Sequence, residues 1–155
     1  MTITATACGA AGTGQPRLVL IGCGARKAAG PALAGTLYTG PYFKACLQAA
    51  VAIAPRSQVL IISARHGLLG LDDGPIAPYE QLPGRPGAVT AATLRAQAAG
   101  RGIAGHPVTA LCGSTYAELA RQVWADVAAL LAGLSIGRQY QELARLRARG
   151  DGGAG

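Results

Sequence analysis

The residue types best suited to catalysis gather in residues 59–79, which read VLIISARHGLLGLDDGPIAPY. Within this stretch His66 precedes two adjacent carboxylates, Asp72 and Asp73, among glycines and prolines that favour a loop. A carboxylate can stabilise a sugar that becomes oxocarbenium-like and can position a water, while a histidine can donate to the departing group. We therefore expect Asp72, Asp73 and His66 to be catalytic residues, and cleavage of a glycosidic bond is one reaction that this set could perform.

The same residues also have structural explanations. Asp72 and Asp73 stand in a Gly/Pro loop, where aspartates often bond their own backbone and form turns. His66 precedes a glycine and could simply hydrogen-bond the turn. Cys23 lies close in sequence to Lys27 and is an alternative nucleophile, because a nearby cation favours the thiolate. These alternatives stay open at the level of the sequence.

A second set of residues is expected to bind the substrate. Glycine turns after buried strands let backbone N–H groups approach a phosphate or a base, and nearby cations can hold phosphates. Tyrosines can stack on a base that has been extruded from a duplex. The predicted substrate-binding residues are Gly22, Cys23, Lys27, Tyr38, Tyr42, Ser63, Arg65, Tyr79, Gly113 and Tyr116.

Buried strands and the helices between them must position these side chains. Apolar runs predict strands at residues 17–21, 59–62 and 108–112, each followed by a glycine or polar turn. Helices are expected at residues 41–54, 89–99, about 114–131 and 139–149, with Ser114 or Thr115 capping the third. This alternation predicts an α/β fold, a single three-layer domain over residues 17–149 with a mainly parallel central sheet. Ligands of such sheets bind beyond the carboxyl ends of the strands.

Composition limits the remaining possibilities. We expect residues 1–16 to be a disordered leader and residues 150–155 a flexible tail. No apolar run approaches the roughly 20 residues that cross a bilayer, and the start lacks the pattern of a signal peptide, so we expect a cytoplasmic protein. The four cysteines are too widely spaced to indicate a zinc site or a disulfide framework. Neither a metal nor a cofactor is expected.

Charge indicates the partner. The chain carries a net charge of +7, and residues 1–71 hold six Lys and Arg residues without one acid. Such asymmetry favours an anionic partner, because Lys and Arg release counterions when they neutralise phosphates. We expect DNA, with RNA or nucleotides as alternatives, no membrane, and a monomer. A charge that merely keeps the protein soluble is the simpler explanation.

A family resemblance rests on ordered motifs within residues 17–140. LVLIGCGARK, LYTGPYF, ISARHGLLGLDDGPIAPYEQL, LCGSTYAEL and GLSIGRQY together resemble the motifs of a family of short bacterial proteins. The central motif also resembles a segment of the YaaA peroxide-stress family and, more distantly, the domain accompanying archaeosine-type tRNA-guanine transglycosylases. The resemblance implies a uracil-DNA-glycosylase-like α/β fold and a role with nucleic acid or modified bases.

The chain departs from these patterns. Gly24 stands where members often have serine, and Leu71-Asp72 where they often have a proline followed by an acid. The turn GCGARK also contains no carboxylate, whereas the glycosylases have a water-activating aspartate motif after the first strand. A glycosylase with this sequence must therefore take its acid from elsewhere in the chain.

Chemistry and resemblance lead to one expected function and two alternatives. We expect a monofunctional N-glycosidase that excises a modified base, such as 5-hydroxymethylcytosine or 5-hydroxymethyluracil, from DNA by hydrolysis. The first alternative is a non-catalytic nucleic-acid-binding protein of the oxidative stress response. The second is a base-exchange or N-ribosidase enzyme that acts on free nucleotides.

Overall fold

The structure, a computed structural model, describes the backbone of residues 17–154 and the side chains of residues 17–150. The expected leader at residues 1–16 and the last residue lie outside this range. In chain order the elements are β1 (Leu18–Gly22), α1 (Ala34–Leu37), α2 (Pro41–Ile53), β2 (Val59–Ser63), β3 (Gly67–Gly70), α3 (Ala91–Gly100), β4 (Val108–Leu111), α4 (Ser114–Val123), β5 (Val127–Ala129) and α5 (Ile136–Ala154).

The strands form one five-stranded sheet in the order β3-β2-β1-β4-β5. Strands β2, β1, β4 and β5 are parallel, and β3 pairs antiparallel with β2 at one edge. The four parallel strands therefore share a carboxyl edge, where each of them ends, and an amino edge, where each begins. The expected α/β architecture with a mainly parallel sheet is confirmed.

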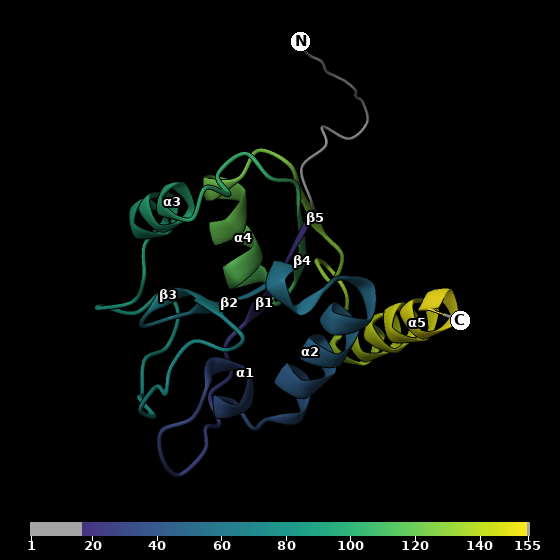
Figure 1. Ribbon diagram of the computed structural model, residues 1–155, viewed down its shortest axis with the longest axis horizontal. Helices are drawn as coiled ribbons and strands as arrows, with labels where there is room; N and C mark the ends of the chain where they lie inside the picture. Colours follow the sequence, from purple (N-terminus) through teal and green to yellow (C-terminus); the bar gives the residue numbers. More distant parts are fainter. Residues whose placement is uncertain (1–16, 155) are drawn as a thin grey trace.

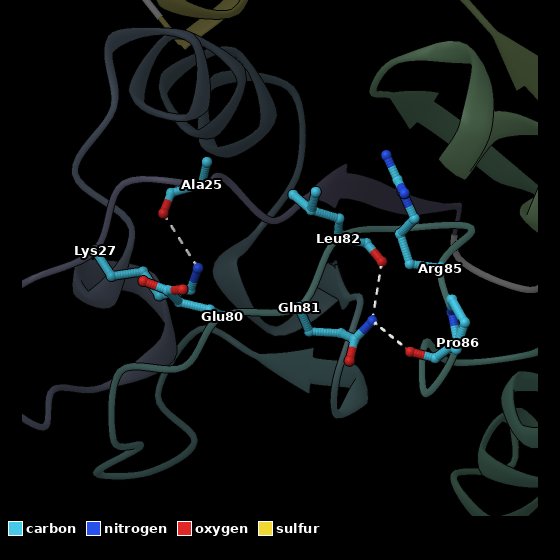
Figure 2. A pocket seen from close by; sticks show the side chains of 7 residues that line it. All are labelled: Ala25, Lys27, Glu80, Gln81, Leu82, Arg85 and Pro86. Atoms are coloured by element: carbon cyan, nitrogen blue, oxygen red, sulfur yellow. Dashed lines mark hydrogen bonds between the residues drawn. The ribbon is translucent and has the colours of Figure 1, made fainter.

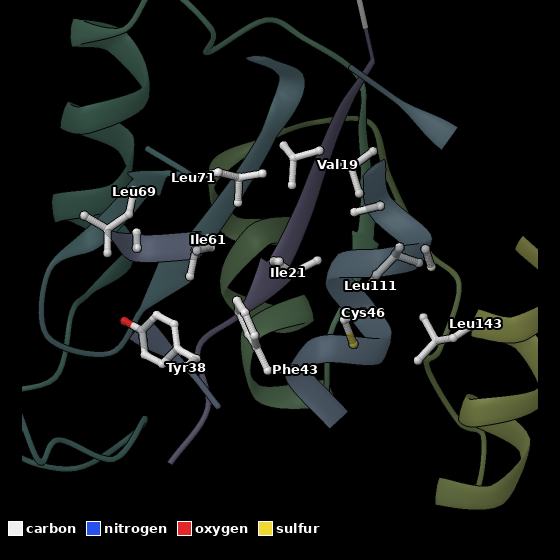
Figure 3. Close-up of a cluster of buried hydrophobic side chains, with 14 of the residues drawn as sticks. Val19, Ile21, Tyr38, Phe43, Cys46, Ile61, Leu69, Leu71, Leu111 and Leu143 are labelled. Atoms are coloured by element: carbon white, nitrogen blue, oxygen red, sulfur yellow. The ribbon is translucent and has the colours of Figure 1, made fainter. Parts of the chain in front are cut away.

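Helices cover both faces of the sheet, because strand side chains alternate between them (Figure 1). Val19 and Ile21 of β1 belong to a core shared with α1, α2 and α5, whereas Leu18 and Leu20 pack towards α3 and α4. Figure 3 shows part of the first core, in which Ile21 lies near Phe43 of α2. Burying one such aliphatic side chain stabilises the fold by about 1.5–3 kcal/mol.

Two short strands were absent from the expectation. Residues 67–70 were expected as loop but form β3, because Leu68 and Leu69 are buried there. Gly67 makes the tight turn possible: its φ is +79°, and a Cβ atom would lie 2.2 Å from Gln97 Oε1. Strand β5 was missed as well, since the predicted third helix extended through it.

The helices differ from expectation mainly at their ends. Helix α4 ends at Val123 because Trp124 adopts an extended conformation and is buried, with its indole N–H donating to the Ile103 carbonyl. Its N-cap is Gly113 with no side-chain cap bond, so the predicted capping by Ser114 or Thr115 is wrong. Helix α5 begins three residues earlier than expected and remains helical to Ala154, five residues beyond the expected end.

Helices α2 and α3 match their predictions closely, whereas the short helix α1 lies in a stretch that was expected to be a loop. Helix α2 begins at Pro41, which suits a first helical position because proline has no N–H to leave unpaired. Thr90 caps α3 by accepting a hydrogen bond from the Thr93 amide. Among the helices of the described range, none combines the length and the apolar composition that crossing a bilayer requires.

Candidate functional site

The segments that follow β1, β2 and β4 meet at the carboxyl edge of the sheet. The chain passes from β1 to β2 on one side and reaches β4 on the other side of β1, so connections diverge between β1 and β4. Such a topological switch point is where open α/β sheets usually bind ligands. The residues that leave these strands are therefore the first candidates for a functional site.

A buried chain of hydroxyl groups fixes the segment after β2. Ser63 Oγ accepts hydrogen bonds from the amides of Arg65 and His66, at 3.2 and 2.9 Å. Tyr79 Oη lies 2.6 Å from Ser63 Oγ and 2.6 Å from Tyr38 Oη. Since both lone pairs of Ser63 serve amides, its hydrogen is donated to Tyr79, which in turn donates to Tyr38. The network anchors Tyr79 to the end of β2.

Cys23 links the segments after β1, β2 and β4. Its Sγ shares a hydrogen bond of 3.0 Å with Tyr116 Oη and accepts one of 3.4 Å from the Ala64 amide. The Tyr116 ring lies directly over Gly22, where a Cβ atom would be only 2.7 Å from a ring carbon. Gly22 is therefore the residue that lets α4 approach the end of β1.

A pocket of about 350 Å³, which we call the switch-point pocket, opens between these segments. Its walls come from the ends of β1 and β4, the first turn of α4, Tyr42 and Pro83. The lining residues are Gly22, Cys23, Tyr42, Pro83, Cys112, Gly113, Ser114, Thr115 and Tyr116. The first amides of α4 have no partner within the helix and no side-chain cap, so this wall offers N–H donors and a positive helix end.

Figure 2 shows a larger cavity of about 640 Å³, which we call the loop cavity. It is formed by Ala25 and Lys27 after β1 and by the loop that follows Tyr79. The loop residues are Glu80, Gln81, Leu82, Arg85 and Pro86. Gln81 Nε2 holds this loop by donating to the carbonyls of Leu82 and Pro86, at 3.1 and 3.2 Å.

Lys27 connects the loop cavity to the hydroxyl network. Its ammonium donates to the carbonyls of Gly24 and Ala25, both at 3.2 Å, and lies 4.4 Å from the centre of the Tyr79 ring. It also lines a cavity of about 310 Å³ with Tyr79 and Glu80. An ammonium over an aromatic face is held by the ring's electrons, which fixes the charge at the cavity wall.

The charges of the two sheet edges are organised differently. At the amino edge, Asp126 pairs with Arg17, Asp72 with Arg56, and Asp73 with Arg101. Two further ion pairs lie within α4 and α5. Among side chains of residues 17–150, Glu80 is the one acid without an ion pair. The carboxyl edge also carries four cations that no described acid pairs with: Arg26, Lys27, Arg65 and Arg85.

Burial sets the protonation state of the groups at the carboxyl edge. It raises the pKa of Tyr79 and Tyr116 well above the usual value for tyrosine, so both phenols stay protonated at neutral pH and remain hydrogen-bond donors. The pKa of His66 is lowered, first by burial and second by the Arg65 cation. His66 is therefore neutral at pH 7.

The structure separates the predicted catalytic carboxylates from the rest of the site. Because β3 runs back along β2, it delivers Asp72 and Asp73 to the amino edge, away from Ser63 and His66. Asp73 closes a turn by accepting a hydrogen bond of 2.8 Å from the Gly70 amide. This is the structural role that the sequence left open as an alternative to catalysis. The expectation that these carboxylates lie beside His66 is corrected: the antiparallel strand moves them to the opposite edge.

Several predicted binding residues reach the carboxyl edge but are buried there. Ser63 is fully buried in the hydroxyl network, and Tyr38 is 1% exposed with its ring against Phe43 at 5.1 Å. Neither side chain can contact a substrate directly, because protein atoms cover both. Tyr79 is also buried, although one side lines the 310 Å³ cavity beside Lys27.

Other predicted residues occupy the open part of the edge. Gly22, Cys23, Tyr42, Gly113 and Tyr116 line the switch-point pocket together. Tyr42 is held there by a hydrogen bond to the Gln139 side chain of α5. The exposed side chains of Arg65 and His66 lie after β2, where the His66 ring meets the edge of Tyr79 at 5.1 Å.

The loop that follows Tyr79 was not among the predicted site residues. Pro83 lines the switch-point pocket, and Glu80 and Arg85 line the loop cavity. A usable signal existed, since a loop that carries charged residues directly after the central motif is a common location for binding groups. Within the described residues, no group of three or more His, Cys, Asp or Glu side chains could hold a metal ion.

Comparison with known proteins identifies the family. No curated protein and no solved structure shows significant similarity to the chain. One family model, described as a family of unknown function (DUF6884), matches residues 18–145. The match spans the whole sheet, the hydroxyl network and both cavities of the carboxyl edge. The chain belongs to the DUF6884 family.

Proposed function

We propose that the protein is an N-glycosidase that removes a modified nucleobase from DNA, with the base held in the switch-point pocket. The observation that carries this proposal is the charge pattern of the carboxyl edge. Four cations that form no ion pair with a described acid lie at the same edge of the sheet as a pocket that presents tyrosine rings and helix amides. A base with its attached phosphate combines the properties that such a site would bind: a flat ring, polar edges and a negative charge.

The proposal assigns a role to each part of the pocket. Tyr42 and Tyr116 supply aromatic surface for the base, and the first amides of α4 supply donors to its polar edge. Lys27 and Arg65 hold phosphates of the strand. A pocket of about 350 Å³ falls within the usual range of about 300–1,000 Å³ for small-ligand sites. A base inside a duplex must first be extruded to enter it.

Glu80 replaces Asp72 and Asp73 as the proposed catalytic carboxylate. Hydrolysis adds water across the bond between C1′ and the base: the water oxygen bonds to C1′, the C1′–N bond breaks, and a proton passes to the base. A carboxylate positions this water and stabilises the positive sugar. Glu80 suits the role because it is the described acid at the carboxyl edge and no arginine or lysine engages it. The neutral amides of α4 and the Tyr116 hydroxyl would stabilise the departing base.

The proposal also assigns the α/β domain to a uracil-DNA-glycosylase-like fold. A uracil-DNA-glycosylase-like fold is supported by the order of the motifs and by a mainly parallel sheet with helices on both faces. The assignment is independent of the catalytic residue, since Glu80 does not occupy the position after β1 where the glycosylases carry their aspartate.

Base release tests the proposal directly. The protein is incubated with single- and double-stranded oligonucleotides carrying modified bases, including 5-hydroxymethylcytosine and 5-hydroxymethyluracil, and free bases are measured by mass spectrometry. We expect release of one base, and a loss of about 100-fold or more in Glu80→Gln, the usual scale for removing a general acid or base. Asp72→Asn and Asp73→Asn are matched controls that should keep the activity. Loss in these variants and not in Glu80→Gln would contradict the assignment.

Binding without catalysis is a second candidate function. It is favoured by one observation: Asp72 and Asp73 lie at the amino edge in ion pairs, so the carboxyl edge contains a single described carboxylate. Under this alternative, oligonucleotides bind, no base is released, and Glu80→Gln binds at least as tightly because it removes a negative charge. That combination of results would replace the N-glycosidase proposal.

A further inference from the structure

The loop cavity is larger than the switch-point pocket, and the proposed function leaves most of it unused. Its volume is about 640 Å³, and its walls carry the two cations Lys27 and Arg85, the carboxylate Glu80 and the exposed side chain of Leu82. Cavities of this size bind whole small molecules. A second ligand group therefore has room beside the base.

The two cavities have no lining residue in common, but neighbouring residues of the same two chain segments line them. Cys23 lines the switch-point pocket and Ala25 lines the loop cavity, and the intervening chain spans at most about 7 Å. On the opposite side, Pro83 lines the pocket while Leu82 and Arg85 line the cavity. A ligand that occupies both cavities therefore needs two units joined by a short link, as two neighbouring nucleotides are.

The charge of the loop cavity indicates what the link would be. Arg85 is exposed and makes no ion pair with any described acid, and the Lys27 ammonium is fixed at the same wall by two carbonyls. Arginine with a free guanidinium binds phosphate oxygens in pairs, and lysine acts as a point charge beside it. The apolar surface of Leu82 and Pro86 can cover the sugar or base of the same unit.

We propose that the loop cavity is a subsite for the nucleotide adjacent to the one whose base enters the switch-point pocket, with its phosphate between Lys27 and Arg85. This inference rests on the proposed function and specifies the substrate class: a polynucleotide strand and not a free mononucleotide. Arg85 is a binding residue of this subsite and takes no part in the reaction at C1′.

Binding of short single-stranded DNA tests the subsite. Fluorescence-labelled mononucleotide and trinucleotide of the same base are titrated against the protein and against Arg85→Gln. We expect Arg85→Gln to weaken trinucleotide binding about tenfold, the scale of one hydrogen bond to a charged group, and to leave mononucleotide binding within twofold. The slope of log affinity against log salt should fall by roughly 0.7 for the trinucleotide alone, the contribution of one phosphate in a single strand.

A matched control and the possible outcomes keep this inference separate from the proposed function. Arg149→Gln removes an exposed arginine at the C-terminal end of α5, where it lines a different cavity together with Arg17, and should change neither affinity. If Arg85→Gln weakened the binding of mononucleotide and trinucleotide equally, the subsite would be overturned. The proposal that the protein binds nucleotides would still stand. No binding of either ligand to the unmodified protein would overturn the proposed function itself. An unchanged trinucleotide affinity in Arg85→Gln would also contradict the subsite.

Discussion

The two edges of the sheet differ in how many of their cations form ion pairs. At the amino edge Arg17, Arg56 and Arg101 each meet a carboxylate, in pairs of 3.8, 2.8 and 3.2 Å. At the carboxyl edge Arg26, Lys27, Arg65 and Arg85 form no ion pair with a described acid, although Glu80 lines the loop cavity together with Lys27 and Arg85. Clustered charge without counter-charges repels itself and lowers stability. Such an arrangement is expected where a ligand supplies the missing negative charge.

Thiol accessibility gives the largest expected difference between the open carboxyl edge and the packed interior. Cys23 is half-buried at the open pocket, whereas Cys46 is 1% exposed and Cys112, although it lines the same pocket, is only 2% exposed. Burial raises the pKa of Cys46 to about 12 and that of Cys112 to about 12. At pH 8 this leaves a thiolate fraction of roughly one in ten thousand for the two buried thiols. We expect iodoacetamide to modify Cys23 at least about 100-fold faster than either of them.

The alkylation experiment uses Cys8→Ser protein, because Cys8 lies outside the described residues, and mass spectrometry of peptides identifies each product. In denaturant the three remaining thiols should react at similar rates, which controls for intrinsic differences. Saturation with an oligonucleotide that binds the pocket should slow the modification of Cys23. Equal rates for the three thiols in the folded protein would show that the carboxyl edge is not open as described.

The stabilities of the two edges should differ as well. Tyr79→Phe removes the hydroxyl that bonds Ser63 and Tyr38, and we expect the free energy of unfolding to fall by about 1–3 kcal/mol because two buried hydroxyls lose a partner. Asp72→Asn removes an exposed ion pair at the amino edge and should cost less than about 1 kcal/mol. Urea unfolding followed by fluorescence of the buried Trp124 measures both. Tyr140→Phe, on an exposed ring, is the matched control for loss of a phenol hydroxyl. A cost for Tyr79→Phe no greater than that for Asp72→Asn would contradict the role of the network.

Much of the fold was predictable because its signals are local. The apolar runs of β1, β2 and β4 and the spacing of apolar residues in α2 act over a few neighbouring residues. Strands β3 and β5 were missed because they are short and consist largely of glycine, leucine, valine and alanine, which do not distinguish a strand from other buried segments. Their pairing with β2 and β4 is what makes them strands.

The candidate site was predicted mainly where it follows strand ends directly, with Tyr42 at the start of α2 as the exception. Gly22, Cys23, Gly113 and Tyr116 were placed correctly because β1 and β4 deliver them to one edge. Asp72 and Asp73 were misplaced by a single undetected strand. Four residues of antiparallel β3 carry the chain back by about 13 Å, roughly the length of β2. A small error in local structure therefore moved two carboxylates from one edge of the molecule to the other.

The smallest expected effect is a pH dependence of stability that arises from His66, through burial first and the Arg65 cation second. The pKa of His66 is lowered in the folded protein by burial and by Arg65, so the unfolded chain binds a proton more readily than the folded one. Above about pH 6.5, the pKa of histidine in the unfolded chain, His66 is neutral in both states and its contribution to stability is fully present. As the pH falls from that value towards the pKa in the folded protein, the unfolded chain takes up a proton first and this contribution is lost. We expect the free energy of unfolding to decrease from pH 7.5 to pH 5.5, and to decrease less in His66→Gln. In Arg65→Gln most of the dependence should remain, because burial against Tyr79 is the larger cause. The opposite result would be a free energy of unfolding that increases from pH 7.5 to pH 5.5 in the unmodified protein but not in His66→Gln. It would mean that the folded protein favours a charged His66, so that the carboxyl edge is less positive than its unpaired cations indicate.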